Sequence, residues 1–154
     1  MSIEKVKQYL DKLGLKENII EFETSSATVE QAAIAVGCGG EQIAKTMSFD
    51  RNGKTILIVL AGDTRVDNAK FKATFGGKAK MLSIDEVENR VGHKVGGVCP
   101  FAVNEGVDVY LDVSLKRFDF VYPAAGNDHS AVKLDISQLE LASCSVGWVD
   151  VGRY

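Results

Sequence analysis

The chain has 154 residues, of which 45% are hydrophobic and 25% charged, and its formal net charge is −3. This is the composition of an ordinary globular protein with length for one sizeable core, so we expect a single domain over residues 1–154. The negative net charge argues against a strongly nucleic-acid-binding surface overall. No apolar run is long enough to span a membrane, so we expect no membrane contact.

The first residues and the cysteines indicate a cytoplasmic protein. Residues 1–5 begin a helical pattern and lack the apolar segment of a signal peptide. The three cysteines are an odd number, are widely spaced and form no C-x-x-C motif: Cys38, Cys99 and Cys144. This usage argues against a disulfide framework and against structural zinc. The two histidines, His93 and His129, do not have the spacing of metal ligands either, so we expect no metal and no cofactor.

The first third of the chain predicts two helices with a short strand between them. Apolar residues recur at helical spacing after Ser2, a suitable N-cap, and Gly14 closes the segment. Residues 19–22 are a short apolar run that is typical of a strand. The capping-box pattern of residues 28–31 opens a second helix, which we expect to end at Gly37.

The middle of the chain predicts a β-hairpin followed by a basic helix. Residues 43–49 and 55–61 are apolar, and the Asn-Gly pair in the loop over residues 50–54 supplies the positive φ angles that a hairpin turn needs. A helix over residues 66–74 follows, in a stretch with five cations against one acid, Asp67: Arg65, Lys70, Lys72, Lys78 and Lys80. Such a basic face suits a transient polyanion contact, and the alternative is a solvated helix face.

From residue 78 onward, short strands alternate with short helices. We expect strands over residues 78–82, 107–113, 118–122, 130–134 and 146–151. We expect helices over residues 84–91 and 136–142, which follow the capping residues Ser83 and Asp135. These elements are interleaved without a regular βαβ period, so they predict a mixed α+β fold rather than a doubly wound one.

Residues 92–101, which read Gly-His-Lys-Val-Gly-Gly-Val-Cys-Pro-Phe, form the densest group of residues with special backbone geometry. Gly96 and Gly97 allow positive φ angles and the close approach of another molecule, and Pro100 restricts the backbone before it. A rigid loop with exposed N–H groups can hold a negatively charged oxygen. The alternative is a tight connection between a helix and a strand that binds nothing.

Two further side chains are candidates for chemistry. Lys45 lies in an apolar strand, where alternation places it on one face with Ile43 and Met47. If that face forms a cleft, the ammonium can bind a phosphate or polarise a carbonyl; if the face is exposed, the lysine is only solvated. His129 follows Asp128 and is either a general base or a polar loop residue.

These stretches together resemble the YbaK/ProX family of aminoacyl-tRNA deacylases, which includes the editing domain inserted in bacterial prolyl-tRNA synthetases. The resemblance rests on residues 43–46, 96–101 and 126–134, and it extends to residues 61–63 and 109–112 in the family's order. It covers nearly the whole chain. The resemblance implies an α+β fold in which helices surround a mostly antiparallel, partly barrel-like sheet.

The resemblance also implies a reaction and a set of site residues. The family hydrolyses the ester between a wrong amino acid and the tRNA 3′ end, usually on proline tRNA. Its key lysine matches Lys45 and lies near the terminal adenosine, and its glycine loop contacts the aminoacyl group through backbone atoms. The expected site is Lys45, Gly96 and Gly97 for catalysis, Val98, Cys99, Pro100, Phe101, Gly126 and His129 for substrate binding, and Arg65, Lys70 and Lys72 for tRNA binding.

We therefore expect a trans-editing hydrolase that acts on tRNA(Pro) carrying a small non-cognate amino acid such as Cys or Ala. The N–H groups of Gly96 and Gly97 would stabilise the oxyanion, and Lys45 would fix a phosphate or the attacking water. The expected partners are the 3′ acceptor end of the mischarged tRNA and prolyl-tRNA synthetase. One alternative is a non-catalytic tRNA- or synthetase-binding module of the same fold. Another is a thiol hydrolase that uses Cys99 with His93 or His129, against which stands a buried, inert Cys99.

Overall fold

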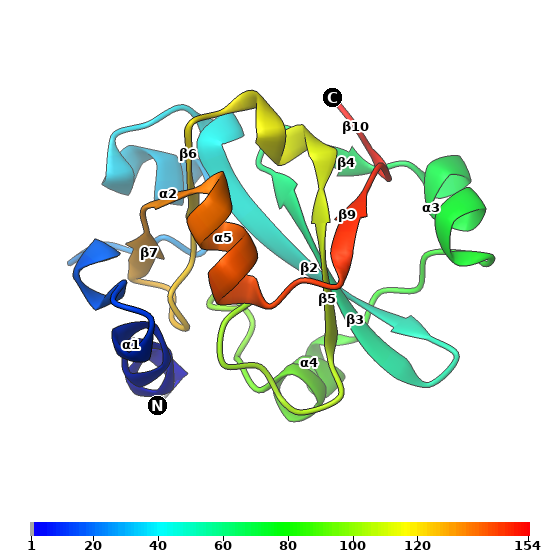
Figure 1. Cartoon of the computed structure of the whole chain (residues 1–154), viewed down its shortest axis with the longest axis horizontal. Helices are drawn as coiled ribbons and strands as arrows, with labels where there is room; N and C mark the ends of the chain where they lie inside the picture. The colour runs from blue at the N-terminus through cyan, green and yellow to red at the C-terminus, as the bar shows by residue number, and fades with distance from the viewer. Residues whose placement is uncertain (1) are drawn as a thin grey trace.

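A twisted, partly barrel-like six-stranded sheet forms the centre of the computed structural model, which describes residues 2–154 (Figure 1). Its strand order is β8-β6-β2-β3-β5-β9. The strands are β2 (Ile43–Arg51), β3 (Lys54–Ala61), β5 (Asp108–Asp112), β6 (Phe120–Pro123), β8 (Leu134–Asp135) and β9 (Gly147–Val149). Two short pairs stand beside the sheet: β1 (Ile19–Glu21) with β7 (Ser130–Val132), and β4 (Arg65–Val66) with β10 (Gly152–Arg153).

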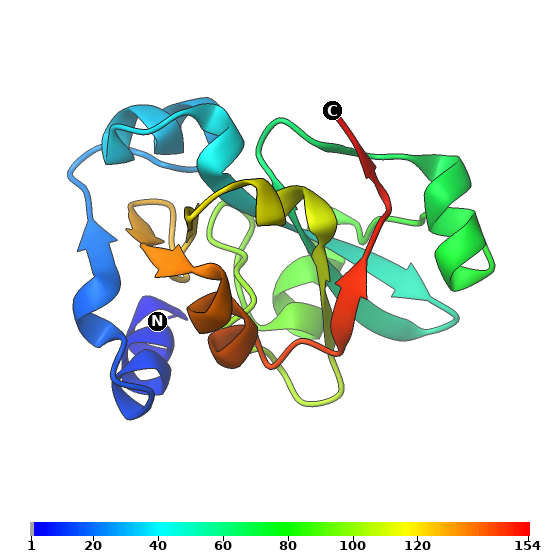
Figure 2. The ribbon, with the colours of Figure 1, turned by 45° about the horizontal axis from the view of Figure 1, so that its top comes forward.

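Helices surround this sheet (Figure 1). They are α1 (Ser2–Lys12), α2 (Val29–Val36), α3 (Asn68–Phe75), α4 (Ile84–Val91) and α5 (Ile136–Ser143), with 3-10 turns η1 (Lys16–Asn18), η2 (Gly40–Gln42) and η3 (Val113–Arg117). In both ribbon views α2 and α3 lie at opposite ends of the molecule (Figures 1 and 2). Within residues 2–154, no helix is both long and apolar enough to cross a membrane.

The sheet combines both pairing directions. Strand β2 pairs antiparallel with β3, and β6 pairs antiparallel with β8, whereas the β2–β6, β3–β5 and β5–β9 pairs are parallel. Both side pairs are antiparallel. The predicted α+β fold with a partly barrel-like sheet is therefore confirmed, whereas the six-stranded sheet is mixed rather than mostly antiparallel, because β6, β5 and β9 each join a neighbouring strand in parallel.

The β2–β3 hairpin follows its turn chemistry closely. Asn52 and Gly53 have φ angles of 53° and 86°, which are the left-handed values of a two-residue turn. The register continues without a break to the pair Arg51 and Lys54. The strands consequently extend into the expected five-residue loop, because the Asn-Gly turn needs no other residue.

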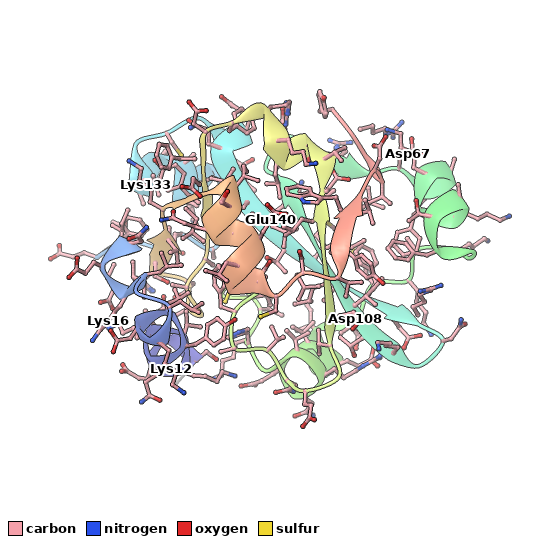
Figure 3. The ribbon with its side chains drawn as sticks, in the orientation of Figure 1. Lys12, Lys16, Asp67, Asp108, Lys133 and Glu140 are labelled. Atoms are coloured by element: carbon pink, nitrogen blue, oxygen red, sulfur yellow. The ribbon has the colours of Figure 1, made fainter. Side chains whose placement is uncertain are left out.

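Side-chain caps begin α2, α3 and α5, and the sequence predicts those at Thr28 and Asp135. The Thr28 hydroxyl accepts from the Gln31 N–H at 3.1 Å, and the Asp135 carboxylate accepts from the Gln138 N–H at 2.8 Å. Asp67 lies at the start of α3 and caps it by accepting from the Lys70 N–H at 3.0 Å (Figure 3). Each cap satisfies a donor that the first helical turn leaves free.

Three expected strands differ from those observed. Residues 78–82 form only a single bridge, Phe49 with Met81, because the segment meets β2 only near the C-terminal end of β2. The expected strand over residues 130–134 divides into β7 and β8, which pair with β1 and β6. The expected strand over residues 146–151 gives way to β9, and the chain then continues into β10, since β9 pairs with β5 and β10 with β4. Pairing partners distant in the chain decide these breaks.

The two faces of the hairpin contribute to different apolar clusters. Leu57 and Val59 belong to a cluster with residues of α1, α4 and α5, such as Leu10, Val87 and Leu139. Ile56, Ile58 and Leu60 belong to a second cluster with Phe71 and Phe75 of α3. On β2, Ala44 belongs to the first cluster and Phe49 to the second. Strand alternation thus fixes which side chains of β2 share a face with α3 and which face the main core.

Candidate active site

A cavity of about 290 Å³ follows β2 between α2, α4, the glycine loop and the ends of β6 and β7. Most of its walls are apolar, and among residues 2–154 Lys45 is the one charged side chain in the lining. Polar atoms come from Thr28, Thr46 and Ser130, among others. Its rim carries three apolar side chains that remain largely exposed: Met81 at 57%, Ile84 at 76% and Val95 at 57%. Such an exposed apolar rim around a pocket is typical of a binding site.

Lys45 reaches the cavity and has no carboxylate partner in the part of the chain that the structure describes. Its Nζ lies 3.4 Å from the Gly62 carbonyl oxygen, a long contact. Burial lowers the pKa of Lys45; the charge of Asp63 opposes this shift, and the charge of Arg65 adds to it. Asp63 is itself bound by the Arg117 guanidinium at 2.6 and 3.0 Å, which lowers the pKa of Asp63. The ammonium of Lys45 is therefore available to an anionic or carbonyl ligand.

The tight backbone beside Lys45 depends on Gly62. A Cβ atom at this position would lie 2.0 Å from the Gly40 carbonyl oxygen and 2.8 Å from a methyl group of Val29. Such distances are far inside van der Waals contact, so only glycine lets the end of β3 meet η2 and α2. This close approach holds α2 against the cavity.

The glycine loop contributes Val95, Gly96 and Val98 to the cavity. Gly96 has a φ angle of 93°, as expected for a glycine in a tight loop. Gly97 differs from the expectation that both glycines offer an N–H to the substrate: its N–H donates to the Lys94 carbonyl oxygen at 3.0 Å. The oxyanion role predicted for Gly97 is corrected on this ground.

Gly97 has a packing role instead. A Cβ atom there would lie 2.6 Å from Cα of Asn127, so the loop can rest on residues 126–128 only with glycine at this position. Gly126 has a φ angle of 102°, and a Cβ atom on it would lie 2.9 Å from the backbone of Ser2. Both glycines line a second cavity of about 660 Å³ on the other side of the loop, together with Lys5, Lys94 and others.

Cys99 and Phe101 are fully buried and line neither cavity, and the buried Pro100 does not line them either. The direct substrate contacts expected for these residues are corrected, because they lie behind the loop and anchor it. His93 is also fully buried; its Nε2–H donates to the Phe101 carbonyl oxygen at 2.7 Å and lies 3.5 Å from the Cys99 Sγ.

The Cys99–His93 pair does not have the properties of a nucleophile and its base. Burial raises the pKa of Cys99 to about 12, and it lowers the pKa of His93. At neutral pH the thiol keeps its proton, and the substrate has no access to the sulfur. The geometry therefore argues against the thiol-hydrolase alternative, although a histidine does lie near the cysteine.

His129 does not take part in the cavity. Its side chain is 47% exposed, its Nδ1 contacts the carboxylate of Asp128, and it lines neither cavity. The main chain is what ties this segment to the site, since the Asp128 carbonyl oxygen accepts from the Ser26 N–H at 2.6 Å.

The predicted tRNA-binding cations are exposed but differ in their surroundings. Arg65 is near enough to Lys45 for its charge to lower the pKa of that lysine. Lys70 is held by the Asp150 carboxylate at 3.1 Å and the Gly152 carbonyl oxygen at 2.8 Å. Lys72 lies on α3, at the end of the molecule opposite α2 (Figure 2). The structure thus brings Arg65 toward the site and places Lys70 and Lys72 farther out.

Much of the lining could not be predicted from the sequence. Val29 and Ala32 of α2, Leu82, and Ile84 and Val87 of α4 all line the cavity. Their helical and capping patterns were visible, but those patterns do not indicate which elements meet. Within residues 2–154, there is no group of three or more His, Cys, Asp or Glu side chains that could hold a metal ion.

Comparisons with known proteins agree with this geometry. Residues 23–141 match the family model described as aminoacyl-tRNA editing domain. The uncharacterized protein YwhH of Bacillus subtilis (strain 168) is 49% identical over 152 residues, which are 98% of this chain and 97% of YwhH. A proline–tRNA ligase of Caldicellulosiruptor bescii is 25% identical over 128 residues, which are 82% of this chain but 22% of the ligase. A solved structure described as a candidate trans-editing enzyme for prolyl-tRNA synthetase matches with a TM-score of 0.89 and 26% identity, over 99% of this chain and 98% of that one.

Proposed function

The chain belongs to the aminoacyl-tRNA editing domain family, and from this membership we propose that it hydrolyses the ester of a mischarged aminoacyl-tRNA. The proposed substrate is tRNA(Pro) carrying a small non-cognate amino acid such as Cys or Ala, and the proposed place of action is the cytoplasm. The observation that carries the proposal is Lys45, an ammonium without a carboxylate partner within residues 2–154, in a mostly apolar cavity. A hydrolase for a small aminoacyl group needs a cavity of this kind, which admits the aminoacyl group and leaves the tRNA outside.

The chemistry requires no nucleophilic side chain. Water adds to the ester carbonyl carbon, and the negative charge that develops on the carbonyl oxygen is stabilised by main-chain N–H groups, of which Gly96 offers one. The bond from the carbonyl carbon to the ribose oxygen then breaks. The products are a free amino acid and a tRNA with its terminal hydroxyl restored, and one proton passes to solvent as the carboxylate forms. Lys45 fixes the terminal nucleotide or the water by its charge.

The tRNA itself must lie outside the cavity. Arg65 is the expected first phosphate contact, because its charge lies close enough to Lys45 to affect that lysine's pKa. Lys72 and the less available Lys70 extend the basic face toward α3. Phosphate contacts of this kind give affinity without reading sequence, so a partner such as prolyl-tRNA synthetase would supply tRNA identity.

The proposal is tested by deacylation of tRNA(Pro) charged with alanine, cysteine, serine or proline. We expect the wild-type protein to release at least one small non-cognate amino acid and to spare Pro-tRNA(Pro). The Lys45→Ala variant should be folded and inactive. If the wild-type protein binds tRNA but releases none of these amino acids, the chain is a non-catalytic binding module and the proposal fails.

A further inference from the structure

The outer edge of β2 is paired at both ends and open between them. At one end β6 pairs with Ile43 and Ala44. At the other end, residues 80–82 form hydrogen bonds with β2. The Asp50 N–H donates to the Lys80 carbonyl oxygen at 2.8 Å, and the Leu82 N–H donates to the Ser48 carbonyl oxygen at 3.1 Å. The cavity lies along the gap, since its lining includes Tyr122 at the end of β6, Leu82, and β2 from Ile43 to Ser48.

Strand alternation identifies the main-chain groups that face this gap. The N–H and C=O of one residue point to the same edge, and those of the next residue point to the opposite edge. The main-chain groups of Ser48 and Asp50 form hydrogen bonds on the outer edge of β2, so the N–H and C=O of Thr46 must also face that edge. The main-chain groups of Lys45 and Met47 face β3. Within residues 2–154, neither the N–H nor the C=O of Thr46 has a partner on this edge.

We propose that this open edge at Thr46 binds the main-chain atoms of the aminoacyl group, as though that group were one residue of an added antiparallel strand. The inference rests on the proposed function and names how its site holds the substrate. An aminoacyl group carries an ammonium donor and a carbonyl acceptor on neighbouring carbons. In an antiparallel pair, these two groups meet the C=O and N–H of a single opposite residue. The Thr46 N–H also becomes a donor for the oxyanion, in place of the N–H of Gly97.

The pairing direction orients the substrate. In an antiparallel pair the ligand carbonyl meets the Thr46 N–H, on the Lys45 side, and the ammonium meets the Thr46 C=O, on the Met47 side. The ester bond and the ribose therefore lie toward Lys45. The amino acid side chain lies on the same face as the Thr46 side chain, which is the face of the main core cluster, with Leu82 and Val87 among the cavity walls. Main-chain pairing thus holds any amino acid, and these walls select its size.

Amide hydrogen exchange measured by NMR tests the inference on the full chain. In the free protein the Thr46 amide should exchange rapidly, whereas the amides of Lys45 and Met47, which bond to β3, should be protected. The probe is 3′-deoxy-3′-(alanylamino)adenosine, an amide that resists hydrolysis. At saturation we expect exchange of the Thr46 amide to slow by about tenfold or more. A probe with a propionyl group, which lacks the ammonium, should bind roughly 10- to 100-fold more weakly.

A matched variant separates main-chain from side-chain binding. Thr46→Val replaces the side-chain hydroxyl, which is buried without a partner within residues 2–154, with a methyl group and leaves the main chain in place. If the main chain holds the aminoacyl group, the alanyl probe should still slow exchange of the amide of residue 46 in this variant. The inference is overturned if the Thr46 amide is already protected in the free protein, or if a folded Thr46→Val binds the probe without slower exchange of the amide of residue 46. It is also overturned if the protein deacylates tRNA while the bound probe leaves Thr46 exchange unaltered, although the proposed function then stands. A protein that neither binds the probe nor deacylates tRNA refutes both.

Discussion

Replacing Lys45 with methionine should remove activity without weakening the fold. The change keeps most of the apolar stem and deletes the ammonium, whose one polar contact within residues 2–154 is the 3.4 Å approach to the Gly62 carbonyl oxygen. Deleting one preorganised charge or donor at a reacting ester typically lowers kcat by about 10²- to 10³-fold, which corresponds to about 2.7–4 kcal/mol. We expect a loss in that range.

Lys45→Met should lower activity but should not lower the stability of the folded protein. Burial lowers the pKa of Lys45 below its ordinary value of 10.5. The unfolded chain therefore binds this proton more tightly than the folded chain, and the free energy of unfolding rises with pH between the lowered pKa and 10.5. At neutral pH the wild-type protein bears the full cost of burying the ammonium, and Lys45→Met does not. Its Tm should be equal to or higher than that of the wild type.

The assay is single-turnover deacylation of mischarged tRNA(Pro) over a pH series, corrected for spontaneous ester hydrolysis. Catalysis should fall as pH rises through the lowered pKa of Lys45, since the charged form is the active one. The control is Lys54→Met, the same change at an exposed lysine of the same hairpin, which pairs with Asp108 at 3.1 Å. It should keep full activity and lose less than about 1 kcal/mol. A folded Lys45→Met with near wild-type activity would refute the reasoning.

Three further predictions follow from the same geometry. Cys99→Ala and Cys99→Ser should remain active, with a loss of about 1 kcal/mol in stability, because the thiol is buried and protonated. A thioester between Cys99 of the wild-type protein and the amino acid would contradict this. The double variant Arg65→Ala, Lys72→Ala should raise KM for mischarged tRNA and flatten the salt dependence of KM, while hydrolysis of an aminoacyl-adenosine stays unchanged. Equal KM values for the variant and the wild type at low salt would count against tRNA binding by the basic face. Asp112→Ala should lower the free energy of unfolding by about 2–4 kcal/mol in urea titrations, since the buried carboxylate accepts from the N–H groups of Ser114 and Val151 at 2.9 Å. A loss below about 0.5 kcal/mol would show that water replaces the carboxylate as acceptor.

Local signals in the sequence were sufficient for most elements. The Asn-Gly pair, the caps at Thr28 and Asp135, and the helical spacing after Ser2 each act within a few residues, so the sequence shows them directly. Lys45 could be singled out for the same reason, as a charge in an apolar strand. The motifs around it, with Gly96 in the loop, were enough to predict the family. The sequence left the burial of Cys99 as one of two alternatives and gave no sign of the pairing of the Gly97 N–H, because both depend on how the loop packs.

Tertiary structure alone decided what the site can do. The open edge at Thr46 exists because β6 stops pairing at Ala44 and residues 80–82 begin near Ser48. These partners lie far from β2 in the sequence, and no local pattern records where their pairing ends. By itself, the sequence determined the elements and the lysine, since periodicity, caps and turns are short-range. The folded chain determined which main-chain groups remain unpaired beside that lysine, since hydrogen bonding between distant segments is settled only when they meet.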